Sequence, residues 1–274
     1  MNQPAMFEKR IRRALRICWT PTLVLNLSGC LPTWAAQPIR ALLVTGGCCH
    51  PYAEQAEILS KGISARAHVS WNIVNQGGTA KDSRIALYQK RDWAKGFDIV
   101  VHNECFADLA DVAWVQRITT PHHAGVAAVV IHCAMHSYRD AKTDEWHKFL
   151  GVASHRHERA RQFEIRTRNQ LHPIMRGFPA RWQPPGSDEL YVIDQLMPTA
   201  EVLADAYGVE TRANQACVWT NQYGRSRVFG VTAGHFNRTL EDDDYLSLVT
   251  RGFLWAVGKL GPDGNPTAGY GPKH

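Results

Sequence analysis

Histidine follows four apolar runs of this sequence, which contains 13 histidines in 274 residues. His50 comes after the run that starts at Ile39, His102 after Asp98–Val101, His132 after Val126–Ile131, and His235 after Arg227–Val231. Imidazole exchanges protons near neutral pH and is a common ligand of divalent metals. Histidines gathered at one place could therefore bind a metal or act as acid and base on a small molecule.

Other polar residues accompany these histidines. Glu104 follows His102 and supplies a carboxylate that could abstract a proton or orient water. His136 stands four residues after His132, but the pair begins where a strand ends, so a shared helical face is not assured. A further four histidines, His122, His123, His155 and His157, fall in loops or at helix ends and are interpreted mainly as solvated surface residues.

Cys133 offers a different chemistry, because it occupies the strand-to-helix turn where hydrolases and amidotransferases of α/β fold place a nucleophile. That turn needs small residues on both sides, whereas His132, Ala134 and Met135 flank this cysteine. A hydrolase based on Cys133 is therefore an alternative interpretation.

The elements that position these residues follow from apolar periodicity. Continuous apolar runs at 39–45, 69–74, 98–102 and 126–131 alternate with helical patterns at 52–66 and 109–119. Strands of this kind, separated by helices, are typical of a parallel sheet covered on both faces. The carboxyl ends of such strands share one edge, where ligands bind, so the histidines are expected to converge there.

The second half is less regular, with short strands expected at 163–167, 190–193, 202–204, 217–220 and 227–231 and a closing helix at 243–259. We predict one doubly wound, mainly parallel α/β domain over residues 37–260. The Gly- and Pro-rich residues 261–274 are expected to form a disordered tail.

The N-terminal 36 residues resemble a bacterial export signal, because a basic segment precedes a run without charge up to Arg40. Leu27-Ser28-Gly29-Cys30 is similar to a lipobox, which predicts lipidation of Cys30 and a membrane-anchored lipoprotein. Ordinary signal cleavage within residues 33–36, giving a periplasmic protein, is the rival, and a retained membrane anchor is a third reading.

Export also changes the charge argument. Residues 1–29 carry five basic residues against one glutamate, so their removal lowers the formal charge from +6 to +2. No stripe of basic and aromatic residues remains, and this excludes nucleic acid as the main partner. Five cysteines stay in the domain (Cys48, Cys49, Cys105, Cys133 and Cys217); they match no zinc motif, their disulfide pairing is open, and an odd number implies a free thiol.

Several of these segments, taken together and in order, resemble the ThuA-like (trehalose utilisation) family. They include Thr45-Gly46-Gly47 with His50, Val129-Val130-Ile131-His132, His172-Pro173-Ile174, Asp188-Glu189-Leu190-Tyr191, Val218-Trp219 and Gly234-His235. The resemblance implies a flavodoxin- or Rossmann-like fold related to class I glutamine amidotransferases. It also implies an association with disaccharide and keto-sugar metabolism.

The resemblance selects His50, His132, Glu189 and His235 as catalytic residues, with Glu104 added from its position. The three histidines could instead hold a divalent metal. His136, Tyr191 and Trp219 are expected to contact a carbohydrate substrate. We therefore expect an enzyme acting on a keto-sugar or disaccharide derivative, with a non-catalytic carbohydrate-binding domain as the alternative.

Overall fold

A sheet of nine strands forms the centre of the computed structural model, which describes residues 36–273. Cys30 and the predicted signal before it lie outside the described residues. Five strands are parallel: β2 (Val69–Asn75), β1 (Ile39–Gly47), β3 (Ile99–Cys105), β4 (Ala127–Ile131) and β11 (Ser226–Val231). The sheet continues antiparallel through β10 (Ala213–Tyr223), β9 (Ala200–Gly208), β6 (Ile165–Thr167) and β7 (Arg181–Trp182).

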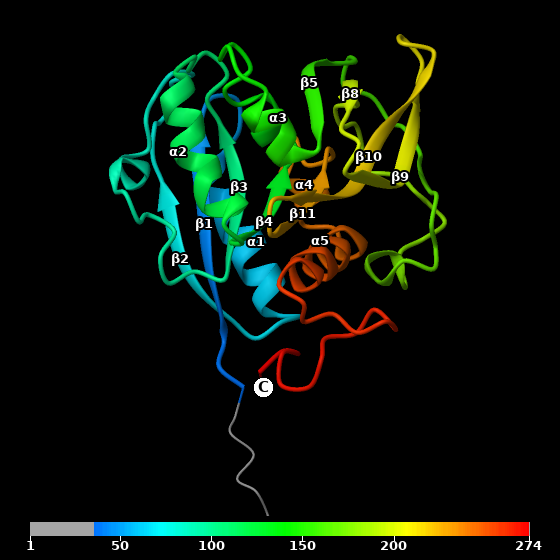
Figure 1. Cartoon of the computed structure of the whole chain (residues 1–274). Helices are drawn as coiled ribbons and strands as arrows, with labels where there is room; N and C mark the ends of the chain where they lie inside the picture. Colours follow the sequence, from blue (N-terminus) through cyan, green and yellow to red (C-terminus); the bar gives the residue numbers. More distant parts are fainter. Residues whose placement is uncertain (1–35, 274) are drawn as a thin grey trace, which may run out of the picture. The chain divides into compact units, whose positions relative to one another are not determined.

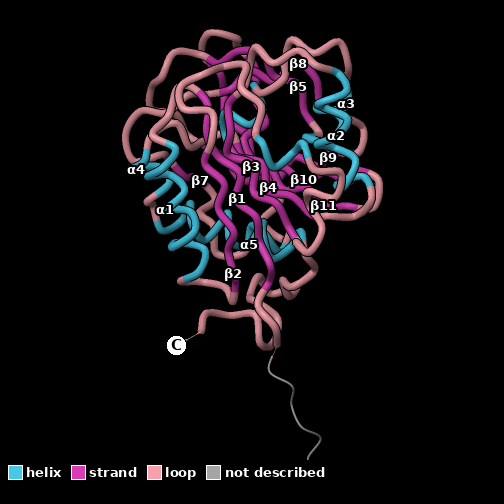
Figure 2. The backbone as a smooth tube through the Cα atoms, turned by 90° about the vertical axis from the view of Figure 1, so that its left-hand side faces the viewer, coloured by secondary structure: helices cyan, strands magenta, loops and turns pink. Residues whose placement is uncertain are grey.

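Helices cover both faces of this sheet, as Figure 2 shows. One face packs against α1 (Tyr52–Ser64), α4 (Asn237–Leu240) and α5 (Asp243–Ala256), and the other against α2 (Val112–His123) and α3 (Glu145–Leu150). Successive residues of β1 point to opposite faces of the sheet. Leu43 packs with α1 and α5, while Leu42 packs with α2 and α3. The predicted α/β fold with a mainly parallel sheet is confirmed.

A separate two-stranded sheet lies at the carboxyl ends of the parallel strands, where Figure 1 shows β5 (Val152–His157) and β8 (Tyr191–Leu196). Their antiparallel register pairs His157 with Tyr191. β5 was not predicted, because its second half, from His155, is exposed and lacks an apolar run. This small sheet therefore brings a histidine to the site that the sequence pattern did not reveal.

Two glycines let the end of β1 approach its neighbours closely. A Cβ atom on Gly46 would lie 1.8 Å from the carbonyl oxygen of Gln76, and one on Gly47 would lie 2.2 Å from that of Cys105. Both residues also adopt positive φ angles, which favour glycine. The loop that carries His50 is thereby held against the ends of β2 and β3.

The expectation of a disordered C-terminal tail is wrong for residues 261–273. The N–H of Thr267 donates to the carbonyl of Lys259, and the N–H of His68 donates to that of Tyr270. The Lys259 ammonium also lies 4.4 Å from the Tyr270 ring centre. The tail lies beside the start of β1 (Figure 1), because its tyrosine packs on the core despite the Gly- and Pro-rich composition.

No helix among residues 36–273 is both long enough and apolar enough to cross a bilayer. The alternative prediction of a retained membrane anchor concerns residues before this range, and it stays a prediction.

Candidate functional site

A cavity of about 390 Å³ opens at the carboxyl ends of β1, β3 and β4, under the small sheet of β5 and β8. Its wall contains six of the predicted site residues: His50, Cys133, His136, Glu189, Tyr191 and His235. His132 lies directly behind, with 1% of its surface exposed. Three of the four strand-end histidines that were expected to converge therefore meet at this edge of the sheet, whereas His102 does not line the cavity.

Three histidines form the centre of the site. The ring centres of His50 and His132 are 4.9 Å apart, those of His50 and His235 are 4.7 Å apart, and those of His132 and His235 are 5.4 Å apart. One ring nitrogen from each histidine lies within 4.8 Å of the other two. Such spacing would allow all three to contact one bound ion.

Backbone carbonyls fix the orientation of two of these rings. His132 Nδ1 lies 2.6 Å from the carbonyl oxygen of Thr232, and His50 Nδ1 lies 3.2 Å from that of His235. A carbonyl only accepts, so each Nδ1 must carry the hydrogen, and in the neutral form of each ring Nε2 has the free lone pair. Histidines that bind metals commonly donate their second N–H in this way.

Glu189 brings a carboxylate to the same histidines. Its Oε2 lies 3.1 Å from Nδ1 of His235 and 3.4 Å from Nε2 of His132, and its Oε1 lies 3.4 Å from Nε2 of His157. The side chain is only 13% exposed, so these contacts are poorly screened by solvent. Three imidazoles and one carboxylate are a donor set that suits a divalent metal such as zinc.

Asp188, which the sequence analysis did not select, positions both Glu189 and His235. Its fully buried carboxylate accepts hydrogen bonds from the N–H groups of Glu189, Gly234 and His235. It also accepts a hydrogen bond of 2.6 Å from the Thr239 hydroxyl. This one side chain joins the loop before β8 to the loop after β11, which are distant in sequence.

The surroundings shift the pKa values of three groups of the site in different directions. Burial acts to raise the pKa of Glu189, but His132 and His235 outweigh it and hold this pKa well below its usual range. Burial acts to lower the pKa of His235, but Glu189 outweighs it and leaves this pKa raised. Burial, helped by His132 and His235, lowers the pKa of His50 to about 3, so its imidazole is neutral at pH 7.

Aromatic rings form one wall of the cavity. His136 stacks on Tyr191 with ring centres 4.0 Å apart and an angle of 5° between the planes, and its Nε2 contacts the Ser154 hydroxyl at 3.0 Å. Burial lowers the pKa of His136 to about 3. The predicted pair His132 and His136 lies on a short 3-10 helix, His132–His136, whose tighter turn carries His136 into the cavity wall.

Of the other histidines, His157 is exposed as interpreted but also contacts the site, whereas His122 is not a surface residue. His157, from β5, reaches Glu189 as described above. His122 is fully buried, with Nε2 3.1 Å from Nε2 of His102. Burial lowers the pKa of His122 to about 3.

Glu104 does not join the site. Successive residues of a strand point to opposite faces, so Glu104 and His102 face the α2 layer, away from the cavity. Their contact is 2.8 Å between His102 Nδ1 and Glu104 Oε1, and both side chains are 0% exposed. The prediction that Glu104 is catalytic is therefore corrected: its carboxylate belongs to a buried network with Tyr88.

Trp219 is also a core residue, not a substrate contact. It is 0% exposed, and its indole N–H donates to the carbonyl of Leu150 at 2.8 Å. A Cβ atom on Gly230 would lie 2.2 Å from its ring, so the indole fills the space over a glycine of β11. The sequence placed this aromatic near the rim because β10 extends farther than expected, over Ala213–Tyr223.

The cysteines are paired in a way that the sequence left open. Cys48 is bonded to Cys49 and Cys105 to Cys133, while Cys217 is a free, buried thiol. The expected free thiol is therefore Cys217. In this state Cys133 has no thiol with which to attack a substrate, so the structure gives no support to the alternative nucleophile.

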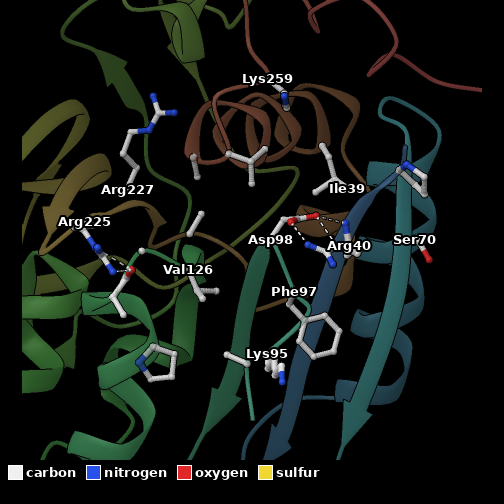
Figure 3. A pocket seen from close by; sticks show the side chains of 18 of the residues that line it. Ile39, Arg40, Ser70, Lys95, Phe97, Asp98, Val126, Arg225, Arg227 and Lys259 are labelled. Atoms are coloured by element: carbon white, nitrogen blue, oxygen red, sulfur yellow. Dashed lines mark hydrogen bonds and ion pairs between the residues drawn. The ribbon is translucent and has the colours of Figure 1, made fainter. Parts of the chain in front are cut away.

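A larger cavity, of about 1070 Å³, lies at the opposite edge of the sheet, where Figure 3 shows Arg40 and Asp98 paired side by side in its wall. Two of its other cations are also engaged: Arg225 donates to the carbonyl of Ala124, and Arg227 stacks over Trp255. No histidine lines this cavity. It therefore lacks an imidazole, and its Asp98 carboxylate is already paired with Arg40.

Comparisons with known proteins agree with this fold. The ThuA family, described as trehalose utilisation, matches residues 40–256. A ThuA-like protein from Parabacteroides merdae has a similar structure, with a TM-score of 0.64, 20% identity and coverage of 87% of this chain and 98% of its own. A ThuA-like protein from Bacteroides uniformis gives a TM-score of 0.63 at 16% identity, covering 85% and 97%. No curated protein matches the sequence. The chain belongs to the ThuA family.

Proposed function

We propose that this member of the ThuA family is an enzyme whose substrate is a carbohydrate, either a keto-sugar or a disaccharide derivative. Its reaction depends on His50, His132, His235 and Glu189. The observation that carries the proposal is the constellation itself: three imidazoles within contact of one point and a carboxylate touching two of them. The cavity volume of about 390 Å³ is in the range of small-molecule sites.

The chain's own groups divide the work of proton transfer. Glu189 is ionised at neutral pH, so it can accept a proton from a carbon next to a carbonyl or from a water molecule. In the site without a metal, His235, whose pKa is raised, can return a proton to the developing oxyanion. Asp188 keeps these two groups 3.1 Å apart, so the proton donor and the proton acceptor face the same point.

The residues that would hold a divalent metal are His50, His132 and His235. The free Nε2 lone pairs of His50 and His132 and the low pKa of His50 fit this role, because a ligand imidazole must be unprotonated. A metal held there would polarise a carbonyl oxygen or activate a water molecule. The stacked rings of His136 and Tyr191 would support the apolar C–H edge of a sugar ring.

Export of the protein, with either lipidation at Cys30 or cleavage before residue 37, is a separate part of the proposal. It is supported by the basic segment and uncharged run of the sequence. The mass of the mature N-terminal peptide, measured after cell fractionation, distinguishes a lipidated Cys30 from an unmodified N-terminus in the periplasmic fraction. A protein that keeps its first residues in the cytoplasmic fraction would contradict export.

The experiment that tests the enzyme is a turnover assay on a panel of keto-glycosides and disaccharides, with the Glu189→Gln variant as the comparison. We expect product formation by the native protein and a loss of at least about 100-fold in the variant, the usual contribution of a general base. Saturable sugar binding without turnover would instead favour a non-catalytic carbohydrate-binding domain.

A further inference from the structure

Four cysteine sulfur atoms form a continuous row at the cavity wall, beside the three histidines. Cys49 and Cys48 are joined by one disulfide, and Cys105 and Cys133 by another. Between the two disulfides, the sulfur of Cys48 lies only 3.9 Å from that of Cys105. All four residues line the cavity.

The backbone holds the two disulfides in this arrangement. The parallel register of β1 and β3 places Gly47 opposite Cys105, and the next N–H, that of Cys48, donates to the Cys105 carbonyl at 3.3 Å. Gly47 permits this approach because any Cβ atom there would clash with the same carbonyl. The contact between Cys48 and Cys105 is therefore built into the sheet edge.

Solvent reaches one end of the row more easily than the rest. Cys49 is exposed, whereas Cys48, Cys105 and Cys133 are 6%, 2% and 7% exposed. A dithiol in solution would therefore attack Cys49 first, because thiol–disulfide exchange depends on access to a sulfur atom. Cys217 is fully buried in the core and takes no part.

We propose that these four cysteines form a thiol–disulfide exchange site whose substrate is a dithiol, and that it transfers two electrons from the exposed Cys49 end to Cys133. This inference requires neither a sugar nor a metal, so it stands apart from the proposed enzymatic function. The proposal also gives a role to the disulfide of Cys133, a residue that occupies the position of a nucleophile.

The exchange proceeds in three balanced steps. A thiolate of the dithiol attacks Cys49, forms a mixed disulfide and releases Cys48 as a thiolate. Cys48 attacks Cys105, forms a new disulfide and releases Cys133 as a thiolate. The second thiol of the substrate attacks the substrate's own sulfur atom in the mixed disulfide. The substrate leaves as a cyclic disulfide, and Cys49 is released. The dithiol is oxidised by two electrons, its two protons pass to Cys49 and Cys133, and one protein disulfide, Cys48–Cys105, remains.

The test is partial reduction of the full-length protein, purified under oxidising conditions, with one equivalent of dithiothreitol. The reaction is quenched with acid, the protein is unfolded, and free thiols are trapped with N-ethylmaleimide for tandem mass spectrometry. We expect equal labelling of Cys49 and Cys133 and a cross-linked Cys48–Cys105 peptide, with Cys217 labelled in every sample as an internal reference. Labelling of Cys48 and Cys49 with Cys105–Cys133 intact would overturn the proposal, as would protein that contains neither disulfide.

Two variants sharpen the test. In Cys105→Ser/Cys133→Ser the acceptor disulfide is missing, so the same treatment should label Cys48 and Cys49 equally. In Cys49→Ser the thiol of Cys48 is free from the start and faces Cys105, so Cys133 should be labelled before any reductant is added. A label found entirely on Cys48 in this second variant would show that the transfer does not occur.

Discussion

The backbone N–H of His235 donates to the carboxylate of Asp188 over 3.2 Å, and this bond links two loops that the sequence separates by 47 residues. The same carboxylate holds the N–H of Gly234 and the hydroxyl of Thr239. Because Asp188 is fully buried, none of these donors has water as a substitute partner. The position of His235 in the site therefore depends on a residue that need not touch the substrate.

Replacing Asp188 with asparagine tests this dependence. The amide nitrogen of the new side chain would face N–H and O–H donors, so we expect the free energy of unfolding to fall by about 2 kcal/mol. We also expect weaker metal or ligand binding, because His235 loses its fixed position. Denaturant unfolding and a binding titration measure the two effects. Asp194→Asn, on the exposed partner of His155, is a matched control; equal results for both variants would contradict the role of Asp188.

The effect of Glu189 on His235 can be measured directly. Glu189 raises the pKa of His235 against the opposing effect of burial. In the Glu189→Gln variant the carboxylate charge is absent, so the pKa of His235 should fall and its imidazole should lose its proton at a lower pH. NMR titration of the chelator-treated proteins follows this change. An unchanged midpoint for His235 would show that the two groups do not interact in solution.

Glu158, which lies outside the candidate site, should make the stability of the protein depend on pH. Its carboxylate is 0% exposed and accepts hydrogen bonds from the backbone of Val209, Glu210 and Thr211. Burial acts to raise the pKa of Glu158, but bonds from Thr211 and Arg161 outweigh it and leave this pKa below its ordinary value of 4.5. A lowered pKa contributes stability above pH 4.5 that is lost as the pH falls through the folded-state value.

The Glu158→Gln variant should therefore be less stable than the native protein by about 2 kcal/mol at pH 7, and the difference should shrink below pH 4.5. Urea unfolding at several pH values gives this comparison. A difference that stays constant from pH 7 to pH 3 would mean that the ionised carboxylate is not what stabilises the turn between β9 and β10.

A substitution of Trp219 should change the stability of the protein without changing its function. Trp219→Phe leaves a space beside Gly230 and removes the bond to the Leu150 carbonyl, so we expect a loss of about 2 kcal/mol in the free energy of unfolding. Metal content and sugar binding should stay the same. Reduced sugar affinity in a stably folded variant would restore the earlier interpretation of this residue.

The sequence was enough to predict the parallel half of the fold, since the buried strands β1, β3 and β4 are continuous apolar runs. Because parallel strands end at one edge, His50, His132 and His235 could be placed together from their positions alone. Glu189 came from the family resemblance, because no periodicity marks the loop before β8, whereas Tyr191 was inferred from its position at a strand end.

The remaining parts depended on three-dimensional contacts that leave little trace in sequence. Glu104 was misplaced because strand ends were known only to within a few residues, and a shift of one residue reverses the face of a side chain. Asp188 and His157 were missed because their roles come from the pairing of segments far apart in the chain. The ordered tail was missed because composition does not show that Tyr270 packs on the core.

The measurement that tests the central claim most directly is the metal content of the purified protein, determined by mass spectrometry for the native chain and for His50→Ala/His132→Ala. His123→Ala, which removes an exposed imidazole outside the cavity, is the control. We expect close to one divalent ion per native and control chain and none in the double variant. The absence of metal from the native protein, or its retention in the double variant, would contradict a metal centre built on these histidines.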